Sequence, residues 1–152
     1  MRPRFQLPPL LARLHQKIEF HDEYERPQRG FFIAELDRRE GGDAPAQPIL
    51  LYVTPESVHG PPVPGPRPPD WVADAAGDEA HDEARITAFA ARGVKEHWRV
   101  SSAPDGGTRI ECRFGVDPGL GRYTKLEVFQ GSQPVRSPTF PDLRLLPQDL
   151  DG

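Results

Sequence analysis

The stretch PDWVADAAGDEAHDEARITAFAARGVKEHWRV (69–100) decides the fold, because it predicts a strand, a helix and a second strand in direct succession. Residues 69–75 are short, largely apolar and preceded by prolines, which is typical of a buried strand. Asp78 suits the N-cap of a helix over 79–92, and the glycine that follows ends that helix. Residues 94–100 then resume as a strand. We expect any reaction centre to lie along the seam between the first strand and the helix.

Acidic side chains are concentrated in this unit. Between residues 68 and 84 there are six acids and no lysine or arginine: Asp70, Asp74, Asp78, Glu79, Asp82 and Glu83. Acids at the start of a helix interact favourably with its dipole, which accounts for the last four. The dipole does not account for Asp70 and Asp74, which lie in or beside the strand.

Length and composition are those of one compact domain of 152 residues with a net charge of -4. The 36% hydrophobic content, with 19 prolines and 14 glycines, indicates a modest core and long connections. The single cysteine, Cys112, excludes an internal disulfide and a cysteine-ligated zinc site, and we expect it in the core. No apolar run is long enough for a membrane span, and no signal peptide is recognisable, so we expect a cytoplasmic protein without a membrane partner. The mild acidity is not typical of nucleic-acid-binding proteins.

The rest of the chain predicts a second helix and four more strands. Residues 7–24 carry apolar side chains at helical spacing, namely Leu7, Leu11, Leu14 and Ile18. Strands are expected over 31–36, 47–54, 108–115 and 122–129, and the prolines of 55–68 predict a loop. The sum is an α/β domain with a mixed sheet and two main helices.

Four runs resemble the Uma family of restriction-endonuclease-like proteins, a branch of the PD-(D/E)XK nuclease fold: QPILLYVTPESVHG (47–60), PPDWVADAAG (68–77), FAARGVKEHWRV (89–100) and SPTFPDLRLLPQDL (137–150). The resemblance implies a restriction-endonuclease-like mixed sheet flanked by two main helices. It also implies a single nuclease-like domain over 1–152 that lacks part of the family's usual N-terminal segment.

The resemblance further implies a Mg²⁺-dependent site for phosphodiester hydrolysis, with an Asp after Pro on one strand, a Glu on the next, and a Lys and a Tyr on the following helix. This sequence departs at each position. Ile49 cannot bind Mg²⁺, and Asp74 is one methylene shorter than Glu. Arg85 stays protonated and cannot act as a base, although it can contact a phosphate. Phe89 lacks the hydroxyl group.

Several residues remain candidates for this site. Asp74, Arg85 and His81 are the catalytic candidates, and Asp74 and Asp37 are the metal candidates. The alternative for Asp74 is a remnant carboxylate paired with Arg85, since one carboxylate holds Mg²⁺ poorly. His81 shares a helix face with Arg85 and is either a substitute base or a solvent-exposed histidine. Asp37 ends a strand and either faces the site or belongs to a surface turn.

Two neighbouring patterns have structural interpretations. Asp70 and Asp74 are about 13 Å apart along a strand, so they cannot share one ion directly, and Asp70 is expected only to start the strand. His97 and Trp98 are expected to alternate, with the histidine outward and the tryptophan inward.

Three functions follow from these observations. The first is a catalytically impaired endonuclease-fold protein, a pseudonuclease acting by binding. The second is an active Mg²⁺-dependent DNA endonuclease with a rearranged site of Asp37, Asp74 and His81; only this one implies a cofactor, Mg²⁺. The third is a protein-interaction scaffold that uses the proline-rich loop at 55–68 in polyproline II conformation. DNA, a protein and a second copy of the chain are the partners these hypotheses imply, and a homodimer would join the basic C-terminal halves into one positive surface.

Overall fold

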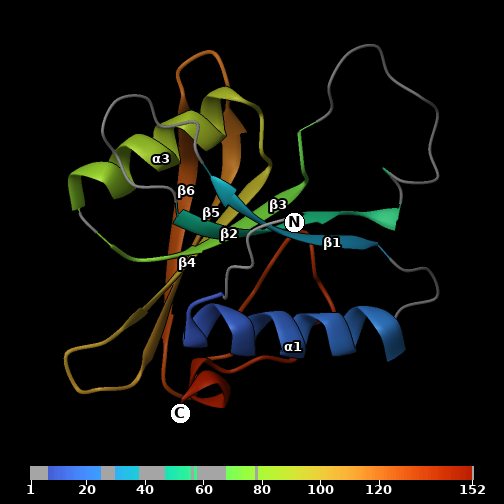
Figure 1. Ribbon diagram of the computed structural model, residues 1–152, viewed down its shortest axis with the longest axis vertical. Helices are drawn as coiled ribbons and strands as arrows, with labels where there is room; N and C mark the ends of the chain where they lie inside the picture. Colours follow the sequence, from blue (N-terminus) through green and yellow to red (C-terminus); the bar gives the residue numbers. More distant parts are fainter. Residues whose placement is uncertain are drawn as a thin grey trace, which may run out of the picture.

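The fold is built on a single six-stranded sheet, seen in a computed structural model that describes residues 7–24, 30–37, 47–55, 57, 68–77 and 79–151. The elements are α1 (Pro9–Tyr24), β1 (Phe31–Asp37), β2 (Gln47–Val53), β3 (Trp71–Ala75), α3 (Glu79–Ala91), β4 (Glu96–Ser102), β5 (Thr108–Asp117), β6 (Arg122–Gln130) and the 3-10 helix η1 (Pro147–Leu150). The two main helices lie on opposite faces of the sheet (Figure 1).

The strands follow one another in chain order across the sheet, from β1 to β6. Each neighbouring pair is antiparallel except β3 and β4, which are parallel. Parallel neighbours need a crossover connection, and α3 supplies it. The mixed sheet with two helices confirms the predicted fold class.

The main core lies between the sheet and α1. Leucines and an isoleucine of α1 at helical spacing pack against strand residues that alternate toward this face: Leu11, Leu14, Ile18, Leu50, Trp71, Trp98 and Ile110. The rings of Trp71 and Trp98 meet edge to face with centroids 5.4 Å apart, and Phe140 lies 5.5 Å from Trp71. Cys112 is fully buried here, which confirms its expected place in the core.

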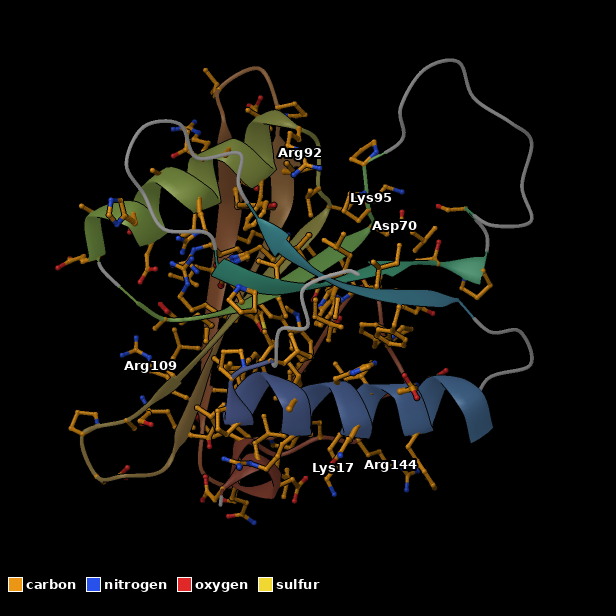
Figure 2. The ribbon with its side chains drawn as sticks, in the orientation of Figure 1. Lys17, Asp70, Arg92, Lys95, Arg109 and Arg144 are labelled. Carbon is orange, nitrogen blue, oxygen red and sulfur yellow. The ribbon has the colours of Figure 1, made fainter. Side chains whose placement is uncertain are left out.

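Asp70 organises the start of β3. Its carboxylate accepts hydrogen bonds from the Thr54 backbone N–H at 2.8 Å and from the Ser57 hydroxyl at 3.2 Å. The exposed ammonium group of Lys95 lies 3.5 Å from the same carboxylate, and Figure 2 labels both residues. The predicted role of Asp70 at the beginning of the strand is confirmed.

Glu96 joins two sequence runs that lie far apart in the chain. Its buried carboxylate accepts hydrogen bonds from the Ser137 hydroxyl at 2.7 Å, the Thr139 backbone N–H at 3.0 Å and the Trp98 indole N–H. The segment after β6 is thereby held against β4. The GVKEHW run (93–98) and the SPTFPDL run (137–143) therefore contact each other directly.

The expected element ends need small corrections. The strand predicted at 94–100 begins only at Glu96, because Gly93 takes φ +83° and the Val94 N–H still bonds to the Phe89 carbonyl at the end of α3. The strand predicted from residue 69 begins at Trp71. Asp78 and most of the proline-rich loop lie outside the described residues. Among the helices that the structure describes, none has the length and apolar character needed to cross a bilayer.

Candidate functional site

The candidate site lies on the sheet face that α3 covers. Side chains of a strand alternate between faces, so β3 directs Trp71 and Ala73 toward α1 and Val72 and Asp74 toward α3. The parallel register places Asp74 beside Arg99 of β4, and His97 lies on the same face two residues earlier. Polar side chains therefore reach this face from two adjacent central strands.

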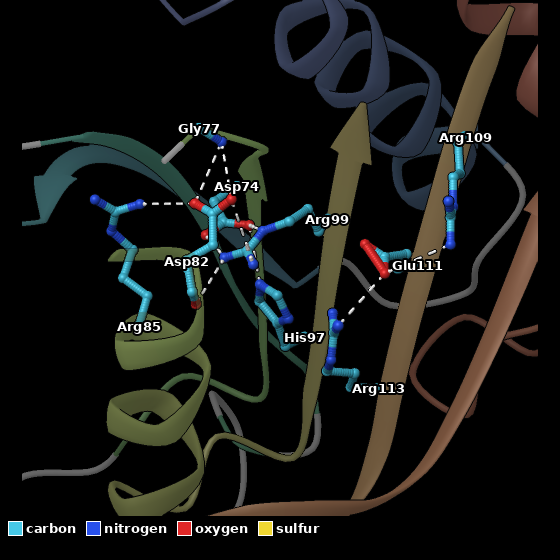
Figure 3. A network of polar contacts seen from close by, with 9 residues as sticks. All are labelled: Asp74, Gly77, Asp82, Arg85, His97, Arg99, Arg109, Glu111 and Arg113. Atoms are coloured by element: carbon cyan, nitrogen blue, oxygen red, sulfur yellow. Dashed lines mark hydrogen bonds and ion pairs between the residues drawn. The ribbon is translucent and has the colours of Figure 1, made fainter. Parts of the chain in front are cut away.

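Asp74 is at the centre of a buried network of polar contacts (Figure 3). His97 Nε2 lies 2.9 Å from Asp74 Oδ1, Arg99 Nε donates to Oδ1 at 3.0 Å, and Arg99 Nη2 donates to Oδ2 at 2.7 Å. The side chains of Asp74 and His97 are fully buried, and that of Arg99 is 4% exposed. Both carboxylate oxygens are thus engaged in the two-point geometry that arginine forms with carboxylates.

The protonation of this group follows from its surroundings. Burial raises the pKa of Asp74, but the hydrogen bonds and charges of His97 and Arg99 outweigh burial and hold the pKa at about 2. Burial lowers the pKa of His97, more than the neighbouring Asp74 raises it. At neutral pH the group is therefore an ionised Asp74, a charged Arg99 and a neutral His97, for which we assign the proton to Nε2, the atom that faces the carboxylate.

Asp82 of α3 extends the network toward the helix. Its carboxylate accepts the Gly77 backbone N–H at 3.0 and 3.2 Å, which ties the start of α3 to the end of β3. Arg99 donates from Nη2 to the Asp82 carbonyl at 3.4 Å, and its Nη1 lies 4.0 Å from Asp82 Oδ2. Arg85, 1% exposed, lies 3.5 Å from Asp82 Oδ1.

The predicted pairing of Asp74 with Arg85 therefore needs correction. Arg99 is the arginine beside Asp74. Arg85 instead lies near Asp82, which is one turn earlier on the same helix. The reason is geometric: Arg99 is in register with Asp74 on the neighbouring strand, whereas Arg85 belongs to the helix layer above.

On β5 the network continues through Glu111, which lies 3.4 Å from Arg113 and 3.9 Å from Arg109. With His97 neutral, the residues drawn in Figure 3 carry four positive charges and three negative ones: Arg85, Arg99, Arg109 and Arg113 against Asp74, Asp82 and Glu111. A Mg²⁺ site needs the opposite balance, an excess of carboxylate oxygens.

The residues present do not fit a Mg²⁺ ion. The carboxylate that would bind it, Asp74, is bonded through both oxygens to a guanidinium group. Ile49, opposite Asp74 on β2, is 1% exposed and offers no donor atom. Within the described ranges, no three histidine, cysteine, aspartate or glutamate side chains converge in a way that could hold a metal.

The structure brings two of the predicted site residues, Asp74 and Arg85, into one network. His81 is half-buried near the start of α3, and the contacts described for this network do not include it. Asp37 ends β1 opposite Gln47, two residues beyond Glu35, which is in register with Ile49 and so with Asp74. The Asp37 side chain lies outside what the structure describes.

His97 was expected to point to solvent, which is wrong. It does alternate with Trp98, but α3 covers its face of the sheet, and the Phe89 ring lies 5.4 Å from the imidazole. Sequence reasoning also missed Arg99 and Asp82. The available signal was the position of Arg99. It follows His97 by two residues in a predicted strand, which puts both side chains on one face.

Comparison with known proteins finds similarity to a solved structure. No protein-family model matches the chain, and no curated protein matches it. Among solved structures it is similar to a protein described as a "putative nuclease belonging to DUF820" from Anabaena variabilis ATCC 29413, with a TM-score of 0.61 and 15% sequence identity. The match covers 99% of this chain and 82% of the other. The chain has a nuclease-like fold.

Proposed function

We propose that this chain is a catalytically impaired endonuclease-fold protein that acts by binding. The observation that supports the proposal is the two-point bond from Arg99 to Asp74 in the site where a nuclease of this fold would hold its metal. The guanidinium group of Arg99 is bonded to the carboxylate that metal-dependent phosphodiester hydrolysis would require as a ligand. The fold is retained while the ionic character of its site is reversed.

The energetics support this proposal. For Mg²⁺ to reach Asp74, Arg99 would have to leave a buried pair, and breaking such a pair costs on the order of 3–5 kcal/mol. The second ligand expected for a nuclease is replaced by Ile49, so little would offset that cost. The Arg85 guanidinium group is a hydrogen-bond donor without an acceptor site, so it cannot serve as a general base. His97 retains a lone pair on Nδ1, but the side chain is fully buried, away from bulk solvent.

A plasmid-cleavage assay with Mg²⁺ or Mn²⁺ tests the proposal. The wild-type chain should leave supercoiled plasmid intact under conditions in which an authentic Mg²⁺-dependent endonuclease cleaves it. Asp74→Ala removes the site carboxylate, and Asp142→Ala removes an exposed carboxylate elsewhere as the matched control. Metal-dependent nicking that persists in Asp142→Ala but is lost in Asp74→Ala would contradict the proposal and favour the rearranged active site.

DNA is the ligand we propose for the binding function, since the fold is nuclease-like and Arg109 is an accessible cation beside the buried network. The Arg109 side chain on β5 is 39% exposed. Lys17 lies on α1, which covers the other face of the sheet (Figure 2). Fluorescence anisotropy with duplex DNA should show binding at low salt that weakens as salt rises, because phosphate contacts release counterions. Arg109→Ala should weaken it more than Lys17→Ala does. No binding at low salt would contradict DNA as the ligand and leave the cleavage result unaffected.

A further inference from the structure

One edge of the sheet carries an exposed strand with the features of an interface. Among the strands that the structure describes, β6 is the outermost, is nine residues long and without proline, and pairs only with β5. Six of its residues are exposed, and Leu126 among them is 52% exposed: Arg122, Thr124, Lys125, Leu126, Glu127 and Gln130. At its end, the Gln130 N–H and C=O are bonded to Gln133. The rest of such an edge presents backbone N–H and C=O groups that proteins normally protect or use for pairing.

The five residues Thr124-Lys125-Leu126-Glu127-Val128 are self-complementary about their centre. If two copies of β6 pair antiparallel around a two-fold axis at Leu126, Lys125 of each copy lies opposite Glu127 of the other. Leu126 then faces Leu126, and Thr124 faces Val128. Opposite charges and apolar pairs at directly facing positions are the contacts that stabilise antiparallel strands.

Other registers are disfavoured by the same residues. A two-fold axis perpendicular to the sheet leaves the same face of both copies on the same side. The axis must then pass between a residue and its own copy, so the alternative registers are those centred on a different residue. Centring on Lys125 places two lysines opposite each other, and centring on Glu127 places two glutamates opposite each other. Only the Leu126 register among these three converts both charges into attractive pairs.

The groups that this pairing would use are available. In the described part of the chain, the Glu127 carboxylate makes no ion pair, and the Lys125 ammonium lies only over the Phe114 ring, at 5.6 Å from its centre. Leu126 is among the few large apolar side chains exposed to solvent. Pairing would cover Leu126 and neutralise two charges per copy.

We infer that β6 is a homodimer interface, in which two copies join their sheets edge to edge around Leu126. The partner is a second copy of this chain, and the inference does not depend on the proposed DNA binding or on the absence of catalysis. The dimer extends one continuous sheet across the axis, with α1 of both copies on one side and α3 of both on the other.

A charge-swap series tests the interface by sedimentation equilibrium of the full chain. The wild type should have twice the monomer mass at high micromolar concentration. Lys125→Glu and Glu127→Lys should each weaken dimerisation at least tenfold, because each puts like charges opposite one another. The double variant Lys125→Glu/Glu127→Lys should restore it. A monomeric wild type, or single variants that dimerise like the wild type, would overturn the inference, as would a monomeric double variant that remains folded by circular dichroism.

Disulfide trapping tests the register separately. Residues directly opposite in an antiparallel pair have Cα atoms about 4.5–5.5 Å apart, within the range that a disulfide spans. Leu126→Cys should therefore crosslink to its own copy on mild oxidation. Thr124→Cys is the matched control on the same face, since its own copy would lie about 13 Å away. The native Cys112 is fully buried. Equal crosslinking of both variants, or none of Leu126→Cys, would overturn the Leu126-centred register.

Discussion

The two faces of β3 and β4 bury side chains equally well but with opposite chemistry. On the α1 face, Trp71 and Trp98 are fully buried in a mainly apolar cluster, where the Glu96 carboxylate bonded to the Trp98 indole is the exception. On the α3 face, Asp74, His97 and Arg99 are buried to the same degree among charges. The comparison shows that burial alone does not make a core apolar: a buried charge is tolerated where each group finds a partner within hydrogen-bonding distance.

The two faces should also fail in different ways. Removing a buried ring leaves a cavity, and no second change at another position fills it. Removing one member of an ion pair leaves an uncompensated charge, which a second change can remove. The three predictions that follow use this difference, in order of decreasing effect.

On the apolar face, Trp98→Ala should lower the free energy of unfolding by about 3–5 kcal/mol, the range for large-to-small changes at buried aromatic positions. The loss includes the contact with Trp71 and the indole hydrogen bond to Glu96. Urea unfolding followed by circular dichroism measures it. A loss below about 1 kcal/mol would mean that this face is not the main core.

On the ionic face, Arg99→Met should lower the free energy of unfolding by about 3 kcal/mol, because Asp74 stays buried without its strongest partner. The double variant Asp74→Leu/Arg99→Met should recover most of this loss, since paired ions replaced by apolar groups of similar size are close to neutral. Urea unfolding of both variants gives the comparison. Losses that simply add in the double variant would show that the pair is not the coupled unit described here.

The smallest effect should be a pH dependence that comes from His97. Its pKa is lowered by burial from the ordinary 6.5, so the unfolded chain takes up a proton below pH 6.5 while the folded chain does not. Stability should therefore fall as the pH drops below 6.5, by up to about 1.4 kcal/mol per pH unit. The lowered pKa of Asp74 makes stability fall only between about pH 3.8 and 2. In that range the unfolded chain is protonated at this group and the folded chain is not.

The measurement is urea unfolding between pH 7.5 and 5.0. His97→Gln should reduce the slope of stability with pH, because it removes the titrating group. Phe89→Leu is the control: it removes the neighbouring ring but no titrating group, so its slope should match the wild type. An unchanged slope in His97→Gln would show that the buried imidazole is not the source.

Most of the fold could be predicted from local patterns. The spacing of Leu11, Leu14 and Ile18 predicted α1, and the strand expected over 108–115 corresponds to β5, because both predictions depend on residues close in the chain. The start of β4 could not be predicted. It depends on the turn after α3, in which the Val94 N–H bonds to the Phe89 carbonyl. The self-complementary run in β6 was readable in the sequence, but its exposure at the sheet edge was not.

The candidate site was predictable only in part. Helical spacing predicted His81 and Arg85 on one face of a helix, and both lie on α3, with Arg85 buried and His81 half-buried. The partner of Asp74 was missed because residues 74 and 99 are neighbours only through the parallel register of two strands. The burial of His97 was missed because strand alternation says which residues share a face, and not what covers that face.

The residues at each position and their close neighbours were enough to predict the strand and helix segments, apart from their ends, and the alternation of their side chains. Only the tertiary structure decided that Arg99 pairs with Asp74, that Glu96 holds the 137–139 segment and that β6 ends the sheet. These contacts join residues distant in the chain, and they depend on the order and register of the strands, which local periodicity leaves open.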